Sequence, residues 1–100
     1  MSGASSVDFH DLFQAFSKLR SEEEFANFLT DLCTPKEIEA LNERWSIVLL
    51  LQEGKTYRDI RAATGSSLST ITRVARFLHQ EQYQGYQLVL NRLKASRRKG

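Results

Sequence analysis

Serine, threonine and arginine side chains gather in one stretch of this 100-residue chain, between Thr56 and Leu78. Hydroxyl and guanidinium groups are donors that proteins use to bind phosphate oxygens and to read base edges. At the N-terminus of a helix, small hydroxyl side chains also let the backbone N–H groups approach an anion closely. The stretch therefore predicts a surface for a phosphate-bearing polyanion, formed by Arg58, Arg61, Ser66, Ser67, Ser69, Thr70, Thr72, Arg73 and Arg76.

Two short helices joined by a tight turn must position these side chains. Thr56 and Asp59 mark the start of the first helix, residues 65–67 form a Gly-Ser-Ser turn, and a second helix follows to about Leu78. The predicted inward positions are Ile60, Ala63, Leu68, Ile71, Val74 or Ala75, and Leu78. This is the helix-turn-helix arrangement, in which the second helix enters the DNA major groove. The alternative is an ordinary helix pair whose hydroxyls are caps and whose arginines are solvated.

The rest of the chain also carries helical signals. Ser21 with Glu24, and Thr34 with Glu37, have the types and spacing of helix N-caps. Apolar residues recur at three- and four-residue intervals around these caps, and Gly85 separates a last helix. No stretch alternates apolar and polar residues long enough to predict a strand. The sequence therefore predicts an all-α fold of about six helices.

A chain of this length holds one domain. We expect residues 1–6, which are small and polar, to be disordered. The predicted helix-turn-helix domain covers residues 7–93, and residues 94–100 form a basic tail that we expect to fray.

Five consecutive apolar residues, 47–51, lie in the predicted third helix. They cover more than one helical turn, so no side of that turn is polar and each side needs a partner. One partner could be a second copy of the chain, which would make the protein a dimer. The alternative is that the chain's own helices surround the third helix.

Several classes of protein are not expected. Cys33 is the only cysteine, and His10 and His79 are the only histidines, which are too few for a disulfide or a usual zinc site. The apolar runs are too short to span a bilayer and no secretory signal is visible, so we expect a cytoplasmic protein without a membrane partner. No spacing of nucleophile and base, or of paired carboxylates, predicts an enzyme.

The net charge of +2 conceals an unequal distribution. Residues 1–53 contain ten acidic and four basic side chains, a net charge of −6, whereas residues 54–100 contain two acidic and ten basic side chains, a net charge of +8. Such asymmetry indicates a basic surface for an anionic partner. The alternative is that these charges only cover solvated helix faces.

Three segments resemble the Trp repressor family. They are residues 32–37 (LCTPKE), 41–44 (LNER) and 69–73 (STITR). The segments 76–78, 85–86 and 90–93 are similar to the YerC/YecD type of Trp repressor-like protein. The resemblance implies six-helix chains that interlock as a homodimer and place two reading helices about one DNA turn apart on a pseudo-palindromic operator.

The resemblance also implies roles for individual residues in DNA binding. Arg58 matches a direct base contact, and Arg61 matches a phosphate contact from the first helix of the motif. The segment 67–72 matches the start of the reading helix, where base and phosphate contacts occur.

A ligand site is implied in the same way. Arg44 and Arg73 match the two arginines that hold the corepressor tryptophan in the family, and Thr34 matches a residue that lines that pocket. Val74 and Phe77 are larger than the residues of the ligand binder and would fill space that an indole needs. We therefore expect no cofactor, with tryptophan or another amino acid disfavoured as corepressor. Phe77 could act as a built-in plug, and the two arginines could instead bind phosphate or pair with acidic side chains.

The resulting prediction is a sequence-specific DNA-binding transcriptional regulator, a repressor that binds double-stranded DNA as a homodimer. One alternative is a helical interaction module that docks an acidic protein partner. A second alternative is an amino-acid-responsive sensor.

Overall fold

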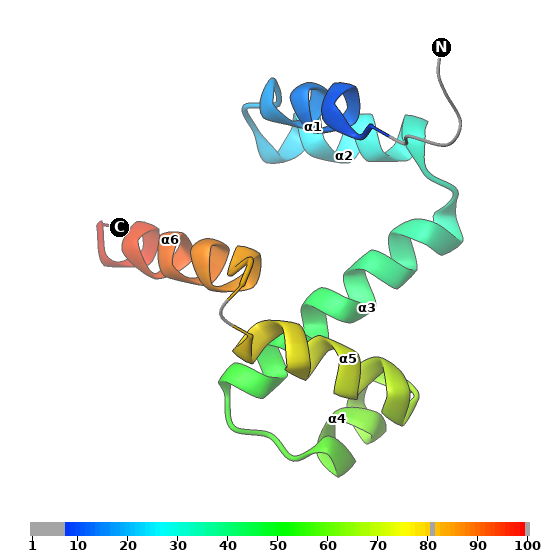
Figure 1. Cartoon of the computed structure of the whole chain (residues 1–100), viewed down its shortest axis with the longest axis vertical. Coiled ribbons are helices and arrows are strands. Elements are labelled where there is room, and N and C mark those ends of the chain that lie inside the picture. The colour runs from blue at the N-terminus through cyan, green and yellow to red at the C-terminus, as the bar shows by residue number, and fades with distance from the viewer. Residues whose placement is uncertain (1–7, 81, 100) are drawn as a thin grey trace. The chain divides into compact units, whose positions relative to one another are not determined.

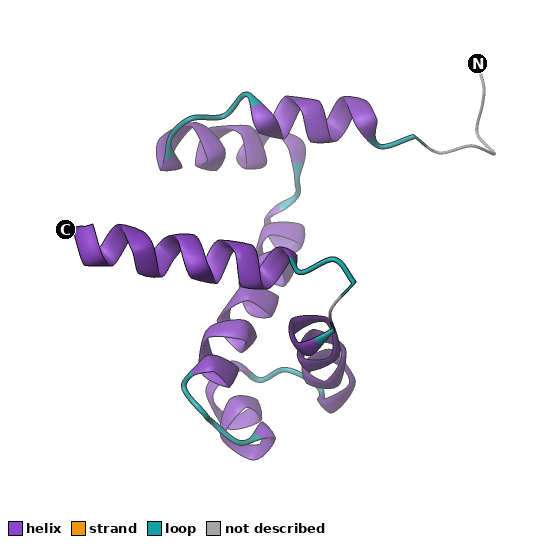
Figure 2. Ribbon diagram, turned by 60° about the vertical axis from the view of Figure 1, so that its left-hand side comes forward, coloured by secondary structure: helices purple, strands orange, loops and turns teal. Residues whose placement is uncertain are grey.

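The computed structural model describes residues 8–80 and 82–99, and of residues 98 and 99 only the backbone. Six helices make up this part of the chain: α1 (His10–Ser17), α2 (Glu22–Leu32), α3 (Pro35–Gln52), α4 (Tyr57–Thr64), α5 (Leu68–His79) and α6 (Gly85–Lys99). Helices and loops alone are present in the described residues (Figure 2), so the all-α prediction is confirmed. The chain divides into two units, residues 1–38 and residues 39–100. The predicted disorder of residues 1–6 lies outside the described residues.

Helices α1 and α2 lie in the first unit, which also contains the first four residues of α3. The Ser21 hydroxyl accepts a hydrogen bond from the Glu24 N–H at 3.1 Å, as the sequence predicts for a cap. The Glu24 carboxylate, however, accepts from the N–H of Arg20 at 2.8 Å rather than from that of the cap residue itself. The rings of Phe16 and Phe28 meet edge to face, with centroids 5.5 Å apart, and join the two helices.

Helix α3 begins and ends where its sequence signals predict. The Thr34 hydroxyl accepts from the Glu37 N–H at 3.2 Å, and the Glu37 carboxylate accepts from the Thr34 N–H at 2.8 Å. The helix ends before Gly54, whose φ of +83° favours glycine. In the apolar run, Ile47 and Val48 are fully buried, but Leu49 is 38% exposed. Within one chain, therefore, the apolar run is only partly covered.

The second unit has a small apolar core. Figure 1 shows α4 and α5 beside the C-terminal part of α3, and α6 following α5. The core cluster consists of Ile47, Val48, Ile60, Ile71, Val74, Leu78 and Leu90. These side chains come from all four helices of the unit, so the core holds the α4–α5 pair against α3.

Two predicted core positions are wrong. Ala63 is exposed, because Thr64, four residues after Ile60, takes the half-buried position on the next turn of α4. Leu68 is 50% exposed, because the inward face of α5 begins one turn later, at Ile71.

The last helix starts after a left-handed residue. The residue with positive φ is Gln84 (φ +59°), and Gly85 is the first residue of α6. The Gln87 side-chain amide donates to the carbonyl oxygen of Leu78 at 3.2 Å and so links α6 to the end of α5. Helix α6 continues to Lys99, through the segment for which we expected fraying.

Candidate nucleic-acid interface

A capping box and a left-handed glycine shape the first half of the helix-turn-helix. At the start of α4, the Thr56 hydroxyl accepts from the Asp59 N–H at 3.1 Å, and the Asp59 carboxylate accepts from the Thr56 N–H at 3.2 Å. At its end, Gly65 has a φ of +73°, and its N–H donates to the Arg61 carbonyl at 2.9 Å. The chain therefore turns sharply at Gly65 and enters α5 three residues later.

Hydroxyl groups cluster at the N-terminus of α5. The Ser67 hydroxyl is the N-cap of the helix and accepts from the Thr70 N–H at 3.2 Å. The same oxygen lies 3.2 Å from the Ser69 hydroxyl and 3.0 Å from the Thr70 hydroxyl. Ser67 and Ser69 are exposed, whereas Thr70 is half-buried. Capping therefore uses part of the hydrogen-bonding capacity of Ser67, and Ser69 has the more open position.

The outer face of α5 brings hydroxyl, apolar and guanidinium groups together. A shallow hollow is lined by Leu68, Ser69, Thr72, Arg73 and Arg76. A second hollow is lined by Tyr57 from α4 and by Thr72, Ala75, Arg76, His79 and Gln80. Thr72 and Arg76 line both hollows and so mark the centre of this face.

Arg58 and Arg61 extend the basic surface onto α4. Both side chains are exposed, as are Lys55 before the helix and Arg73 and Arg76 on α5. The carboxylate of Asp59 is held by the Thr56 cap. The helix-turn-helix therefore offers five exposed cations, and its acidic residue is engaged in the α4 cap.

The prediction that Ser66 lies on the outward surface is wrong. Ser66 was expected among the outward contacts, but its side chain is only 4% exposed. Its hydroxyl donates to the Glu43 carboxylate of α3, and the Thr64 hydroxyl lies 2.8 Å from its oxygen. Because it is buried and hydrogen-bonded inside the protein, the Ser66 hydroxyl is not available to a phosphate or a base. The other eight predicted contacts remain exposed or half-buried on α4, the turn and α5.

Phe77 lies under two of the predicted contacts. The guanidinium carbon of Arg73 is 4.6 Å from the ring centroid of Phe77, and that of Arg76 is 5.3 Å from it. A cation over an aromatic face is attracted by the ring quadrupole. The ring therefore restrains both guanidinium groups along α5.

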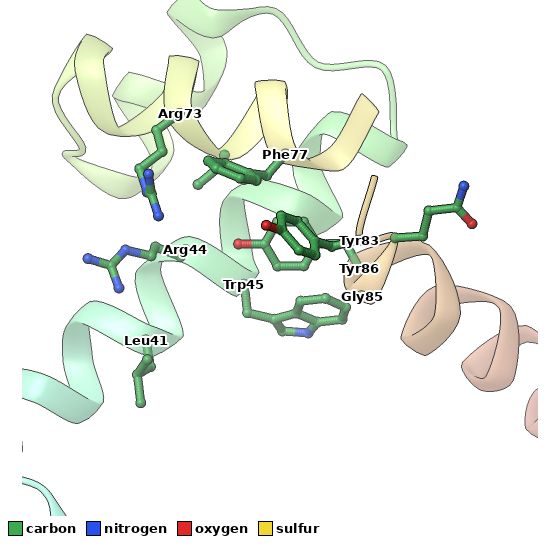
Figure 3. Close-up of a pocket in the computed structure, with 10 residues that line it drawn as sticks. Leu41, Arg44, Trp45, Arg73, Phe77, Tyr83, Gly85 and Tyr86 are labelled. Carbon is green, nitrogen blue, oxygen red and sulfur yellow. The ribbon is translucent and has the colours of Figure 1, made fainter. Parts of the chain in front are cut away.

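A pocket of about 460 Å³ lies between α3, α5 and the start of α6. Its lining comprises Leu41, Arg44, Trp45, Arg73, Val74, Phe77, Tyr83, Gln84, Gly85 and Tyr86. Figure 3 shows Arg73 extending from α5 toward α3 and Arg44 extending from α3, while the rings of Tyr83 and Tyr86 lie on the side of α6 and Trp45 extends from α3 toward them. The structure therefore brings two of the three predicted ligand residues together. The third, Thr34, caps α3 in the first unit.

Val74 and Phe77, which were expected to fill space that an indole needs, form part of the wall of this pocket. The volume that remains lies within the range of small-molecule sites. Trp45 was expected to pack, and its ring indeed lies 6.2 Å from that of Tyr86. The tyrosines of the α5–α6 segment were missed as lining residues, because their spacing resembles that of an ordinary helix face.

Two features are absent from the part of the chain that the structure describes. No group of three or more His, Cys, Asp or Glu residues is placed to hold a metal ion there. No helix among the described residues is long and apolar enough to cross a membrane.

Comparison with known proteins places this geometry in a family. The sequence model of the Trp repressor protein matches residues 7–94. The chain is 40% identical over 83 residues to the uncharacterized protein YerC of Bacillus subtilis, which covers 83% of this chain and 79% of YerC. The crystal structure of a TrpR-like protein from Eubacterium eligens matches with a TM-score of 0.77 and 40% identity, covering 85% of this chain and 87% of the other. A structure from Staphylococcus aureus matches with a TM-score of 0.77 and 34% identity, covering 93% and 89%.

Proposed function

The chain belongs to the Trp repressor family, and from that premise we propose that it is a transcriptional repressor that binds a pseudo-palindromic operator as a homodimer. Membership indicates a helix-turn-helix DNA-binding regulator rather than an enzyme. The observation that carries the proposal is the outer face of α5, where Ser69 and Thr72 lie beside Arg73 and Arg76. Hydroxyls supply directional contacts to bases, and guanidinium groups supply phosphate contacts that are independent of sequence.

The proposed contacts divide into two groups by their chemistry. Arg61, Arg73 and Arg76 bind phosphates and supply much of the affinity. Arg58 contacts a base edge, together with the hydroxyls of Ser67, Ser69, Thr70 and Thr72. In a homodimer, two copies of α5 would meet successive major-groove faces about one DNA turn apart.

Selection of duplexes from a random pool, followed by a salt titration, tests this function. We expect an enriched two-fold sequence. Each neutralised phosphate contributes roughly −0.9 to the slope of log affinity against log salt, so phosphate contacts from three arginines in each of two chains predict a slope of about −5. Affinity that stays constant between about 50 and about 200 mM salt would contradict the proposal, and binding to an acidic protein would then be the remaining interpretation.

Two arginine variants separate affinity from specificity. Arg76→Ala should weaken selected and unrelated duplexes alike and make the salt slope shallower by roughly 0.9 for each lost contact. Arg58→Ala should instead reduce the preference for the selected duplex, by about 1–3 kcal/mol for a lost bidentate base contact. Equal loss of preference in both variants would argue against this assignment.

The pocket supports a second candidate function, that of an amino-acid-responsive sensor. Arg44 and Arg73 could hold a carboxylate, and the surrounding rings could cover an apolar body. Calorimetry with tryptophan, and operator titrations with and without it, distinguish the two functions. Heat of binding together with tighter operator binding would support the sensor. Neither effect is expected if Phe77 holds the reading helix without a ligand.

A further inference from the structure

Ser66 combines burial with a polar contact across the fold. Among the described residues it is the one buried polar side chain, at 4% exposure. Its hydroxyl donates to the Glu43 carboxylate, 23 positions earlier in the chain. The Ser66 oxygen is 2.8 Å from the Thr64 hydroxyl, and the Ser66 N–H donates to the Thr64 oxygen at 3.1 Å. We call Thr64, Ser66 and Glu43 the turn tether.

The turn tether connects the point where α4 gives way to α5 with the middle of α3. The single hydroxyl hydrogen of Thr64 goes either to Ser66 or to the Ile60 carbonyl, 2.8 Å away. In both cases the Ser66 N–H donates to Thr64 and so links the last turn of α4 to the turn. A hydrogen bond to an ionised carboxylate is roughly twice as strong as a neutral one, and it is directional. The apolar contacts of Ile60 and Ile71 with α3 hold the motif to the core, but apolar burial is non-directional.

We propose that Glu43 is a positioning residue which, through Ser66, fixes the turn of the helix-turn-helix against α3 and so sets the direction of α5. The proposal rests on the proposed function, because α5 is the helix that would enter the groove. Helix α5 begins two residues after Ser66, so the position of the turn decides where Ser69 and Thr72 point. The protein thereby uses its own side chains to orient its reading helix.

The charge of Glu43 and its hydrogen bond to Ser66 predict opposite effects on DNA binding, so a Glu43 variant distinguishes them. A carboxylate beside a DNA-binding motif repels phosphates, so removing its charge should tighten DNA binding if electrostatics alone mattered. Glu43→Gln keeps the size of the side chain and an acceptor oxygen but weakens the hydrogen bond. The turn tether therefore predicts weaker binding of the selected duplex, which is the opposite sign.

The experiment measures the affinity of full-length variants for the duplex selected by the wild-type protein and for a scrambled duplex. Ser66→Ala leaves the carboxylate without its partner and should reduce affinity for the selected duplex about tenfold. Glu43→Gln should reduce it about threefold, and the double variant should bind no more weakly than Ser66→Ala, because both changes break one interaction. Binding to the scrambled duplex should change little, since phosphate contacts tolerate a small change in the direction of α5.

Glu39→Gln is the matched control, because it removes the same charge one turn earlier on α3 from an exposed side chain. This variant should bind the selected duplex as tightly as the wild type or slightly more tightly. If Glu43→Gln behaves like Glu39→Gln, or if selected and scrambled duplexes lose affinity equally in Ser66→Ala, the positioning role is wrong.

Amide hydrogen exchange without DNA keeps this test separate from the proposed function. In Ser66→Ala, the amides of residues 64–67 should exchange faster, while those of α6 should be unchanged. Unchanged exchange at the turn would overturn the inference even if DNA binding is weakened. If the wild type selects no duplex, the proposed function fails, and the exchange result still decides whether the turn tether orders the turn.

Discussion

Side chains of one type have different roles in this motif according to position. Ser66 is buried and donates to Glu43, Ser67 caps α5, and Ser69 lies on the outer face. The sequence alone placed all three on one polar surface. How deeply each hydroxyl is buried depends on where the turn contacts α3. The position of that contact cannot be derived from the spacing of residues within the motif.

Phe77 also has a role that its residue type alone does not reveal. Its ring faces the guanidinium groups of Arg73 and Arg76, at 4.6 and 5.3 Å. Phe77→Leu keeps an apolar side chain but removes the aromatic face, so both arginines should lose a restraint of about 0.5–1 kcal/mol each. We expect weaker binding to every duplex, by about five- to thirtyfold for the two arginines of one chain in affinity titrations.

Phe77→Tyr is the control for this change, because it keeps the ring. It should bind duplex DNA like the wild type. If Phe77→Leu also binds like the wild type, the ring does not orient the two arginines.

At the scale of the helices, the local signals in the sequence were reliable. The caps at Thr34 and Thr56 and the turn at Gly65 all form where their residue types predict. Such signals act over three or four residues, so tertiary packing has little influence on them. The exception is the start of α6, where Gly85 was expected to separate the last helix but is its first residue, and Gln84 before it is left-handed.

Two glycines allow one substitution to be compared in two backbone environments. A Cβ atom added at Gly65 or at Gly85 would meet no heavy atom within 4 Å, so neither substitution creates a clash with a neighbouring residue. Gly65 has a φ of +73°, and Gly65→Ala should lower the free energy of unfolding by about 1–2 kcal/mol. Gly85 is the first residue of α6 and has no positive φ, so Gly85→Ala should raise the free energy of unfolding, by less than the roughly 0.5–1 kcal/mol expected inside a helix.

Denaturant unfolding at a fixed protein concentration measures both changes. We expect the two changes in the free energy of unfolding to have opposite signs. A loss of stability in both variants would mean that Gly85 is needed for more than helix formation.

At the scale of the whole chain, much apolar surface is left uncovered. Eight apolar residues are buried among those that the structure describes, whereas thirteen large apolar side chains are exposed. Phe9 and Phe13 at α1 are 56% and 62% exposed, and Leu88 and Val89 on α6 are 49% and 45% exposed. Uncovered faces of this kind are typical of chains that associate, and they support the homodimer that we propose.

A dimer has a direct signature in solution. Sedimentation should give twice the 11.5 kDa mass of one chain, and the unfolding temperature should rise with protein concentration. Phe13→Glu should shift the mass toward that of one chain, because Phe13 is exposed in the single chain and its charge would be buried only in a dimer.

Gln14→Glu adds the same charge at the next exposed position and should leave the mass unchanged. A mass of one chain for the wild type would contradict the dimer, and the exposed faces would then need another partner.

The sequence by itself determined the helices, their caps, the helix-turn-helix and the family, because these depend on periodicity and on motifs only a few residues long. The tertiary structure decided which side chains point inward. It buried Ser66 against Glu43, exposed Ala63 and Leu68, and joined Arg44 and Arg73 in one pocket with Tyr83 and Tyr86. These outcomes depend on how α3 packs against the three helices that follow it, and no local pattern specifies the angle of that packing.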